Sequence, residues 1–137
     1  MSGSILLDTC AAIWISQGDP IDDEAGVIIA DLDRAGGVIA VSPITAWEVG
    51  TLVSRGRLAL SREPTAWFQA LIEAGVELAS MAPPILIASS FLPGVAPRDP
   101  ADRILAATAR IMNYRLITRD KGLLDYAAAG HLDALAC

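Results

Sequence analysis

The sequence predicts an α/β fold, a three-layer α/β/α sandwich around a central, mostly parallel sheet of four to five strands. Short apolar runs recur along the chain, and their length suits strands that helices cover on both faces. Segments with apolar residues at helical spacing separate these runs, and this alternation is typical of a parallel sheet. The chain has 137 residues, of which 53% are hydrophobic and 19% charged. That is enough for one core, so we expect a single domain over residues 1–137.

Strands and helices are expected to follow one another from the N-terminus onward. In chain order they are a strand at Ile5–Leu7, helices at Ala11–Gln17 and Asp22–Ala35, a strand at Val38–Val41, helices at Ser42–Arg55 and Ser61–Gly75, a strand at Val76–Ser80, helices at Pro83–Phe91 and Ala101–Asn113, a strand at Arg115–Thr118, a helix at Leu123–Ala129 and a fifth strand at Leu132–Ala136.

Local capping signals mark the ends of several of these helices. Gly36-Gly37 is a C-terminal stop signal for the second helix. Ser42 and Pro43 provide an N-cap and a first helical residue for the third helix. Asp99-Pro100 begins the clearest helix of the chain in the same way.

The formal net charge is −6, so the chain lacks the basic character that usually accompanies nucleic-acid binding. Several of the acids are, however, expected to gather at a metal site, where a bound cation changes the local charge. The average charge therefore does not exclude a substrate that carries phosphate.

The cysteines and the hydropathy of the chain indicate the cellular compartment in which it is expected. Cys10 and Cys137 show neither metal-ligand spacing nor the density of a disulfide scaffold, so we expect small buried or terminal thiols in a reducing environment. The apolar run before Asp8 lacks the basic residues of a signal peptide. No run approaches the ~20 apolar residues of a membrane helix. We expect a soluble, cytoplasmic protein with no membrane partner.

Acidic residues lie where a parallel sheet binds ligands. Asp8 follows the first strand and Asp120 follows the fourth, and such sheets bind ligands beyond the carboxyl ends of their strands. Each has a structural alternative as a helix N-cap, the role that we assign to Asp99. Asp102 falls at the third position of its helix, where the helix dipole tolerates negative charge.

Glu48 lies several residues inside a predicted helix, among side chains expected to face the core, including Trp47. A buried free carboxylate is costly, so Glu48 is paired, or holds a metal, or occupies an exposed position of the helix. His131, the sole histidine, lies outside any group of polar residues. Acid–base mechanisms that depend on histidine are therefore excluded.

Four short motifs occur in a fixed order along the chain. They are Leu6-Leu7-Asp8-Thr9; Val41-Ser42, then three intervening residues and Ala46-Trp47-Glu48; Arg98-Asp99-Pro100, then one intervening residue and Asp102-Arg103; and Leu116-Ile117-Thr118, then one intervening residue and Asp120. Over nearly the whole chain this pattern resembles PIN-domain proteins, specifically the VapC-type toxins of bacterial toxin–antitoxin pairs. The chain departs from the pattern at Cys10, Pro97 and Ala101, where relatives often carry histidine, a polar residue and an aromatic residue.

The resemblance implies a three-layer α/β/α fold, a Mg²⁺ or Mn²⁺ cofactor, and endoribonuclease activity restrained by a cognate antitoxin, with a homodimer as the expected assembly. The residues that match the acidic quartet are Asp8, Glu48, Asp102 and Asp120. Of the quartet, Glu48 is expected to bind the metal through water or to orient the nucleophile, and the three aspartates to hold it directly. Residues that match or support the site in other ways are Thr9, Asp99 and Thr118.

We hypothesise in-line hydrolysis of RNA that leaves 5′-phosphate and 3′-hydroxyl ends, because carboxylate-bound Mg²⁺ or Mn²⁺ activates water and stabilises charge on phosphate. Candidate RNA contacts, each with an alternative as a solvated charge or ion pair, are Arg55, Arg57, Arg98, Arg103, Arg119 and Lys121. Two other function classes remain: a non-catalytic PIN-fold binding module, and a phosphoryl-accepting domain with Asp8 as nucleophile. The complete set of four acids disfavours the first, and the lack of a second acid close to Asp8 disfavours the other.

Overall fold

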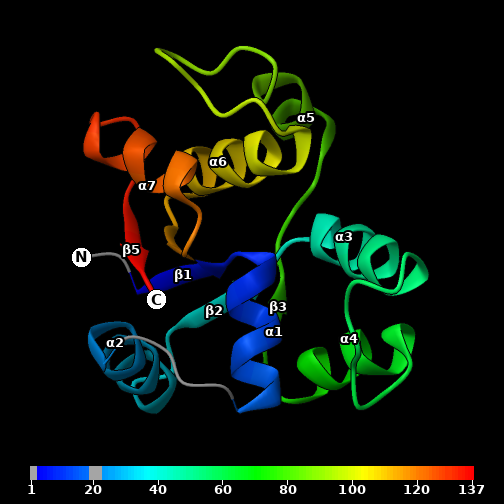
Figure 1. Cartoon of the computed structure of the whole chain (residues 1–137). Coiled ribbons are helices and arrows are strands. Elements are labelled where there is room, and N and C mark those ends of the chain that lie inside the picture. The colour runs from blue at the N-terminus through cyan, green and yellow to red at the C-terminus, as the bar shows by residue number, and fades with distance from the viewer. Residues whose placement is uncertain (1–2, 19–22) are drawn as a thin grey trace.

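The computed structural model describes residues 3–18 and 23–137 (Figure 1). Its strands are β1 (Ser4–Leu7), β2 (Val38–Val41), β3 (Glu77–Leu78), β4 (Arg115–Thr118) and β5 (Ala134–Ala136). Its helices are α1 (Thr9–Gln17), α2 (Asp23–Arg34), α3 (Pro43–Ser54), α4 (Pro64–Glu73), α5 (Pro83–Ala88), α6 (Pro100–Met112) and α7 (Lys121–Ala128). None of the helices in these described ranges has the length and apolar character needed to cross a bilayer.

The strands form one sheet in the order β3-β2-β1-β4-β5, and every neighbouring pair is parallel. From β1 the chain builds outward through β2 to β3, and then returns to the other side of β1 to form β4 and β5. Strand order therefore reverses between β1 and β4. In parallel sheets the carboxyl ends of the two strands at such a reversal are where ligands bind.

Successive side chains of β1 lie on opposite faces of the sheet. Ile5 and Leu7 of β1 join a core cluster with residues of α1, α2 and α4, whereas Leu6 joins a second cluster with residues of α6 and α7. Figure 1 shows these two helix layers on opposite sides of the sheet. All three side chains are at most 2% exposed, which explains why the strand is continuously apolar in sequence. The predicted three-layer α/β/α fold is confirmed.

Most expected elements occur within a few residues of their predicted bounds, but some differ. The strand expected at 76–80 is reduced to Glu77–Leu78, because it is an edge strand whose two residues are both exposed. Helix α4 begins at Pro64, where the carboxylate of Glu63 caps it, rather than at Ser61. Asp22, which we expected to begin the second helix, lies outside the described residues.

Candidate active site

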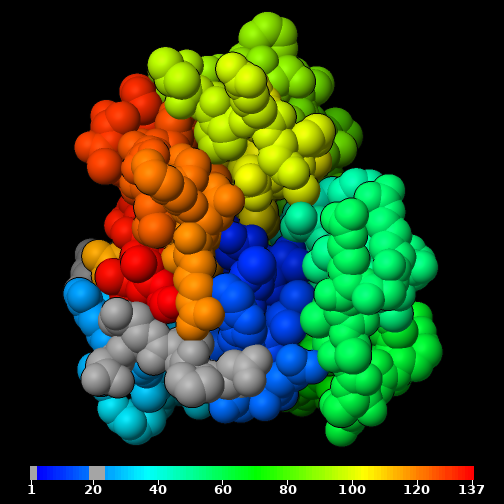
Figure 2. All heavy atoms as spheres, viewed as in Figure 1, coloured from blue at the N-terminus to red at the C-terminus, as the bar shows by residue number. Residues whose placement is uncertain are grey.

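The acids meet at the point where strand order reverses. Asp8 directly follows β1, and its backbone N–H donates to the carbonyl of Ile117 in β4, so the two strand ends lie side by side. Asp120 follows β4 by two residues, and Asp102 lies in the first turn of α6. Figure 2 shows the N-terminal segment, in blue, at the base of a recess between α3, α6 and α7.

Asp8 is held by hydrogen bonds to both carboxylate oxygens. The backbone N–H of Thr9 donates to Oδ1 over 2.5 Å, and the hydroxyl of Thr118 donates to Oδ2 over 2.5 Å. The first bond makes Asp8 the N-cap of α1. Capping and a site role are therefore compatible, since each carboxylate oxygen keeps a second lone pair for another ligand.

Thr118 connects Asp8 to the loop that carries Asp120. Its Oγ1 donates to Asp8 and accepts the backbone N–H of Asp120 over 3.0 Å. The carboxylate of Asp120 in turn accepts the N–H of Leu123 over 2.9 Å and caps α7. A single buried hydroxyl thus fixes both aspartates relative to the end of β4.

Glu48 is tied to the same group of residues through Thr9. The hydroxyl of Thr9 donates to Oε1 of Glu48 over 2.6 Å, while its backbone N–H serves Asp8. Glu48 is half-buried on α3. The helix therefore presents this carboxylate toward the strand edge, as the sequence motif implied.

Asp99 caps the helix that carries Asp102. Its Oδ1 accepts the backbone N–H groups of Ala101 over 2.8 Å and Asp102 over 3.2 Å, so its predicted role as an N-cap is confirmed. Pro100 occupies the first helical position, where its missing N–H costs nothing. The cap sets where α6 begins and so where Asp102 stands at the edge of the site.

The carboxylates raise one another's affinity for protons. Burial raises the pKa of Asp102 to about 7, and the negative charges of Asp120, Asp99, Asp8 and Glu48 add to the effect. Burial is also the main cause that raises the pKa of Asp8 and of Glu48, against the lowering by their hydroxyl partners. Such a group of acids has unmet negative charge that a cation would relieve.

The donor set fits a hard, hydrated cation. Carboxylate oxygens suit Mg²⁺ and Mn²⁺, and Mg²⁺ keeps several waters and needs only one or two protein carboxylates. Within the described residues no three histidine, cysteine, aspartate or glutamate side chains are arranged to hold a metal ion together. The acids act on one another electrostatically, since the charges of Asp120, Asp99, Asp8 and Glu48 all raise the pKa of Asp102. They fit water-mediated binding better than an all-protein cage.

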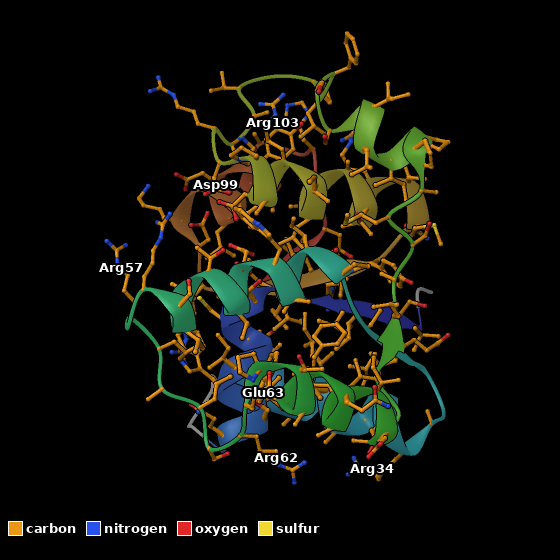
Figure 3. All side chains as sticks on the ribbon, turned by 90° about the vertical axis from the view of Figure 1, so that its right-hand side faces the viewer. Arg34, Arg57, Arg62, Glu63, Asp99 and Arg103 are labelled. Carbon is orange, nitrogen blue, oxygen red and sulfur yellow. The ribbon has the colours of Figure 1, made fainter. Side chains whose placement is uncertain are left out.

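Three of the six candidate RNA contacts are already engaged within the protein. Arg103 donates from Nε to the carbonyl of Ser89 and from Nη1 to that of Pro97, each over 2.8 Å. It therefore ties the loop before α6 to the helix. Figure 3 labels Arg103 beside this loop.

Arg119 and Lys121 are the other two engaged cations. The guanidinium of Arg119 lies 3.5 Å from the ring centroid of Trp14 and also donates to the carbonyl of Cys137. Lys121 forms an exposed ion pair with Asp125 at 2.8 Å. The remaining candidates, Arg55, Arg57 and Arg98, are exposed.

Trp47 was expected in the core, and this is wrong: its side chain is 64% exposed. On α3 the buried positions are Thr45 and Val49, and Trp47 lies on the outer side of the helix. Cys10 is also exposed, whereas Cys137 is buried as expected. The prediction for Trp47 was wrong because two polar residues, Thr45 and Glu48, occupy the inward positions of this helix.

Thr45 is the residue that the sequence patterns did not single out. It is fully buried, and its hydroxyl lies 2.9 Å from that of Thr9. A polar residue three positions before Glu48, on the same face of an apolar helix, was the available signal.

Known proteins match the chain over nearly its full length. A sequence profile of the PIN domain family matches residues 5–129. Ribonuclease VapC22 from Mycobacterium tuberculosis (strain ATCC 25618 / H37Rv) is 31% identical over 121 residues, which cover 88% of this chain and 89% of that protein.

Solved structures share the fold at low sequence identity. VapBC2 from Rickettsia felis, bound to a DNA fragment from their promoter, matches with a TM-score of 0.67 at 14% identity, over 96% of this chain and 97% of that one. FitAcB from Neisseria gonorrhoeae matches with a TM-score of 0.52 at 21% identity, over 96% of each chain. The resemblance that the four motifs indicated is confirmed, and the chain belongs to the PIN domain family, among its VapC-type members.

Proposed function

We propose that this chain is a metal-dependent endoribonuclease and the toxin of a toxin–antitoxin pair, with residues 1–137 acting as one PIN domain. The observation that carries the proposal is the meeting of four acids at the strand reversal, with the pKa of Asp102 raised to about 7 by burial and by its acidic neighbours. The relative named Ribonuclease VapC22 supports the activity.

The roles of the acids follow from their surroundings. Bound Mg²⁺ or Mn²⁺ would supply a more acidic water and stabilise charge on the phosphate. Asp8, Asp102 and Asp120 would hold it, with Asp8 and Asp120 kept in place by Thr118. Glu48, oriented by Thr9, would bind through water or direct the attacking water toward the phosphorus. The products would carry 5′-phosphate and 3′-hydroxyl ends.

The exposed arginines are the better candidates for substrate phosphates. Arg57, just beyond α3, projects on the same side of the molecule as Asp99 in Figure 3. With Arg55 and Arg98 it is exposed, and none of these three forms an ion pair among the described residues. Arg103, Arg119 and Lys121 would have to leave their present partners to contact RNA.

The proposed partners are a cognate antitoxin and a second copy of the chain, in the cytoplasm. The structural likeness to VapBC2 and to FitAB bound to a DNA fragment, the latter with a TM-score of 0.56 at 20% identity, supports an antitoxin. The family resemblance supports the homodimer, and it also implies an antitoxin C-terminal segment that places a basic residue among the acids.

The test is cleavage of total RNA by purified, antitoxin-free protein with Mg²⁺ or Mn²⁺, beside an Asp8→Asn variant. We expect cleavage that needs the metal, disappears on chelation, and is lost in the variant. End mapping should find 5′-phosphates, and cyclic 2′,3′-phosphates would contradict the mechanism. Absence of both cleavage and metal binding would instead favour a non-catalytic PIN-fold binding module.

A further inference from the structure

A chain of hydrogen-bonded hydroxyls leads from the core to Glu48. Thr45 is fully buried, and its Oγ1 lies 2.9 Å from Oγ1 of Thr9. Oγ1 of Thr9 lies 2.6 Å from Oε1 of Glu48. Thr45 and Glu48 are three residues apart on α3, so their side chains lie on adjoining positions of one helix face. Thr9 comes from α1 and bridges the two.

The number of hydrogens fixes the direction of this chain. A hydroxyl carries one hydrogen, and an ionised carboxylate has none to give. Thr9 therefore donates its only hydroxyl hydrogen to Glu48. Its contact with Thr45 must use the hydrogen of Thr45, so the order of donation runs from Thr45 to Thr9 to Glu48.

Burial makes Thr45 more than a packing residue. Thr9 is itself only 4% exposed, so water has little access to its hydroxyl. The Thr9 hydroxyl then gives its hydrogen to Glu48 and uses one lone pair to accept from Thr45, so its side chain is held from both sides. Donation by Thr45 also polarises the Thr9 hydroxyl and strengthens its bond to Glu48. A valine at position 45 would have nearly the same shape but no hydrogen to give.

We propose that Thr45 is a positioning residue, which holds the Thr9 hydroxyl in the orientation that keeps the Glu48 carboxylate beside Asp8. The consequence for metal binding and cleavage rests on the proposed function. The hydrogen-bond order itself does not, and the experiment below separates the two.

The test compares Thr45→Val and Thr45→Ser with Thr108→Val, a matched control. Thr108 is equally buried, but its hydroxyl donates to the carbonyl of Ile104 within α6. We expect Thr45→Val to weaken Mn²⁺ binding, measured by calorimetry, about tenfold, the lower end for losing a partner of a metal-binding side chain. Thr45→Ser should restore binding to within about twofold, and Thr108→Val should change thermal stability alone.

A double-mutant cycle with Thr9→Val makes the inference specific. If Thr45 acts through Thr9, the double variant should bind Mn²⁺ no more weakly than Thr9→Val alone. The same pattern is expected in kcat for RNA cleavage, with KM little changed. Fully additive effects, or equal losses in Thr45→Val and Thr45→Ser, would overturn the proposal.

Crystal structures of the two Thr45 variants provide a readout that needs neither metal nor RNA. The hydrogen bond from Thr9 to Glu48 should keep its length in Thr45→Ser, whereas in Thr45→Val the Thr9 side chain should shift and Glu48 should move with it. Unmoved Glu48 in both would refute the positioning role. Displacement of Glu48 in a protein that cuts no RNA would uphold that role and refute the proposed function.

Discussion

At the residue scale, the candidate site places negative charges where burial and mutual repulsion oppose ionisation. Asp102 has no hydroxyl or backbone partner among the causes of its pKa shift, whereas Asp8 and Glu48 are each compensated by hydrogen bonds. Asp102 is therefore the acid whose charge most needs a cation. Threonines at positions 9 and 118 stabilise the charges of the other two.

Asp102→Asn should stabilise the metal-free protein at high pH. The pKa of Asp102 rises from 3.8 to about 7 on folding, so between these values the folded state binds the extra proton. Stability of the metal-free protein should then fall as pH rises from about 4 to 7, and stay lowered above 7. Asparagine removes this loss. Allowing for solvent screening, we expect a gain of the order of 1 kcal/mol, or about 4 °C in Tm, at pH 8.

The comparison is thermal unfolding in chelator at pH 4 and pH 8. Near pH 4 the variant and the wild type should melt together. Asp33→Asn, at an exposed position on α2, is the matched control and should stay within about 0.5 kcal/mol at both pH values. Equal melting of Asp102→Asn and wild type at pH 8 would contradict the electrostatic account.

At the scale of elements, the N-terminus of α6 and the loop before it define one wall of the site. Asp99 caps the helix, and Arg103 ties the loop to it through two carbonyls. A second tie runs from the hydroxyl of Tyr126 on α7 to the carbonyl of Pro93 over 2.6 Å. The loop is thus fixed from two helices, although its residues Phe91 and Val95 are exposed.

Asp99→Ala and Asp99→Ser should differ in stability by about 1 kcal/mol, the usual value of an N-cap hydrogen bond. Both substitutions remove the negative charge beside Asp102, so that contribution cancels in the comparison. Serine keeps an oxygen that accepts the helix N–H groups, and alanine does not. Urea unfolding of the two variants measures the difference, and identical midpoints would show that the cap has no role in stability.

Arg103→Gln should loosen the loop over residues 89–98. It removes two hydrogen bonds from a charged donor, which together contribute about 2–3 kcal/mol when half-buried. Hydrogen exchange followed by mass spectrometry should find faster exchange in this loop and unchanged exchange in β1 and β2. Arg57→Gln, at an exposed position without such bonds, is the control. Unchanged exchange in Arg103→Gln would mean that Tyr126 alone holds the loop.

Elements with strong local signals were predictable, and those set by tertiary context were not. β2 and β4 lie inside the sheet on either side of β1, and their predicted bounds are confirmed because most of their residues are apolar and most are buried. β3 is an edge strand, whose length depends on its neighbour β2 rather than on its own residues. The four acids could be found from motif order, whereas the exposure of Trp47 depends on how α3 is rotated against α1 and α4.

At the scale of the whole molecule, an all-parallel sheet brings every strand's carboxyl end to one edge. The site therefore gathers residues that are far apart in sequence: Asp8 and its hydrogen-bond donor Thr118 are 110 residues apart. The mutual repulsion of the acids lowers the stability of the folded state, and packing of the two core clusters on either side of the sheet offsets it. Anything that neutralises the acids should consequently stabilise the entire fold.

Mg²⁺ or Mn²⁺ should raise the Tm of the wild type at pH 8, and chelator should reverse the effect. Binding to the folded state alone contributes RT ln(1 + [L]/Kd), about 1.4 kcal/mol at ten times Kd. The rise should shrink below pH 6, where Asp102 is protonated, and should be smaller in Asp102→Asn. NaCl at equal ionic strength is the control, since an equal rise with NaCl would indicate screening without a metal site.

The three tryptophans occupy three different surroundings, which makes the protein's own fluorescence informative. Trp67 is 4% exposed and donates to Ser16, Trp14 lies under Arg119, and Trp47 is 64% exposed on α3. Trp47 should therefore supply the long-wavelength, acrylamide-quenchable part of the emission. Trp47→Phe should remove that part and change stability by no more than about 0.5 kcal/mol. In the wild type, an antitoxin or second copy that covers the outer side of α3 should shift the emission of Trp47 to shorter wavelength and protect it from acrylamide. Binding at this surface can therefore be followed without an added label.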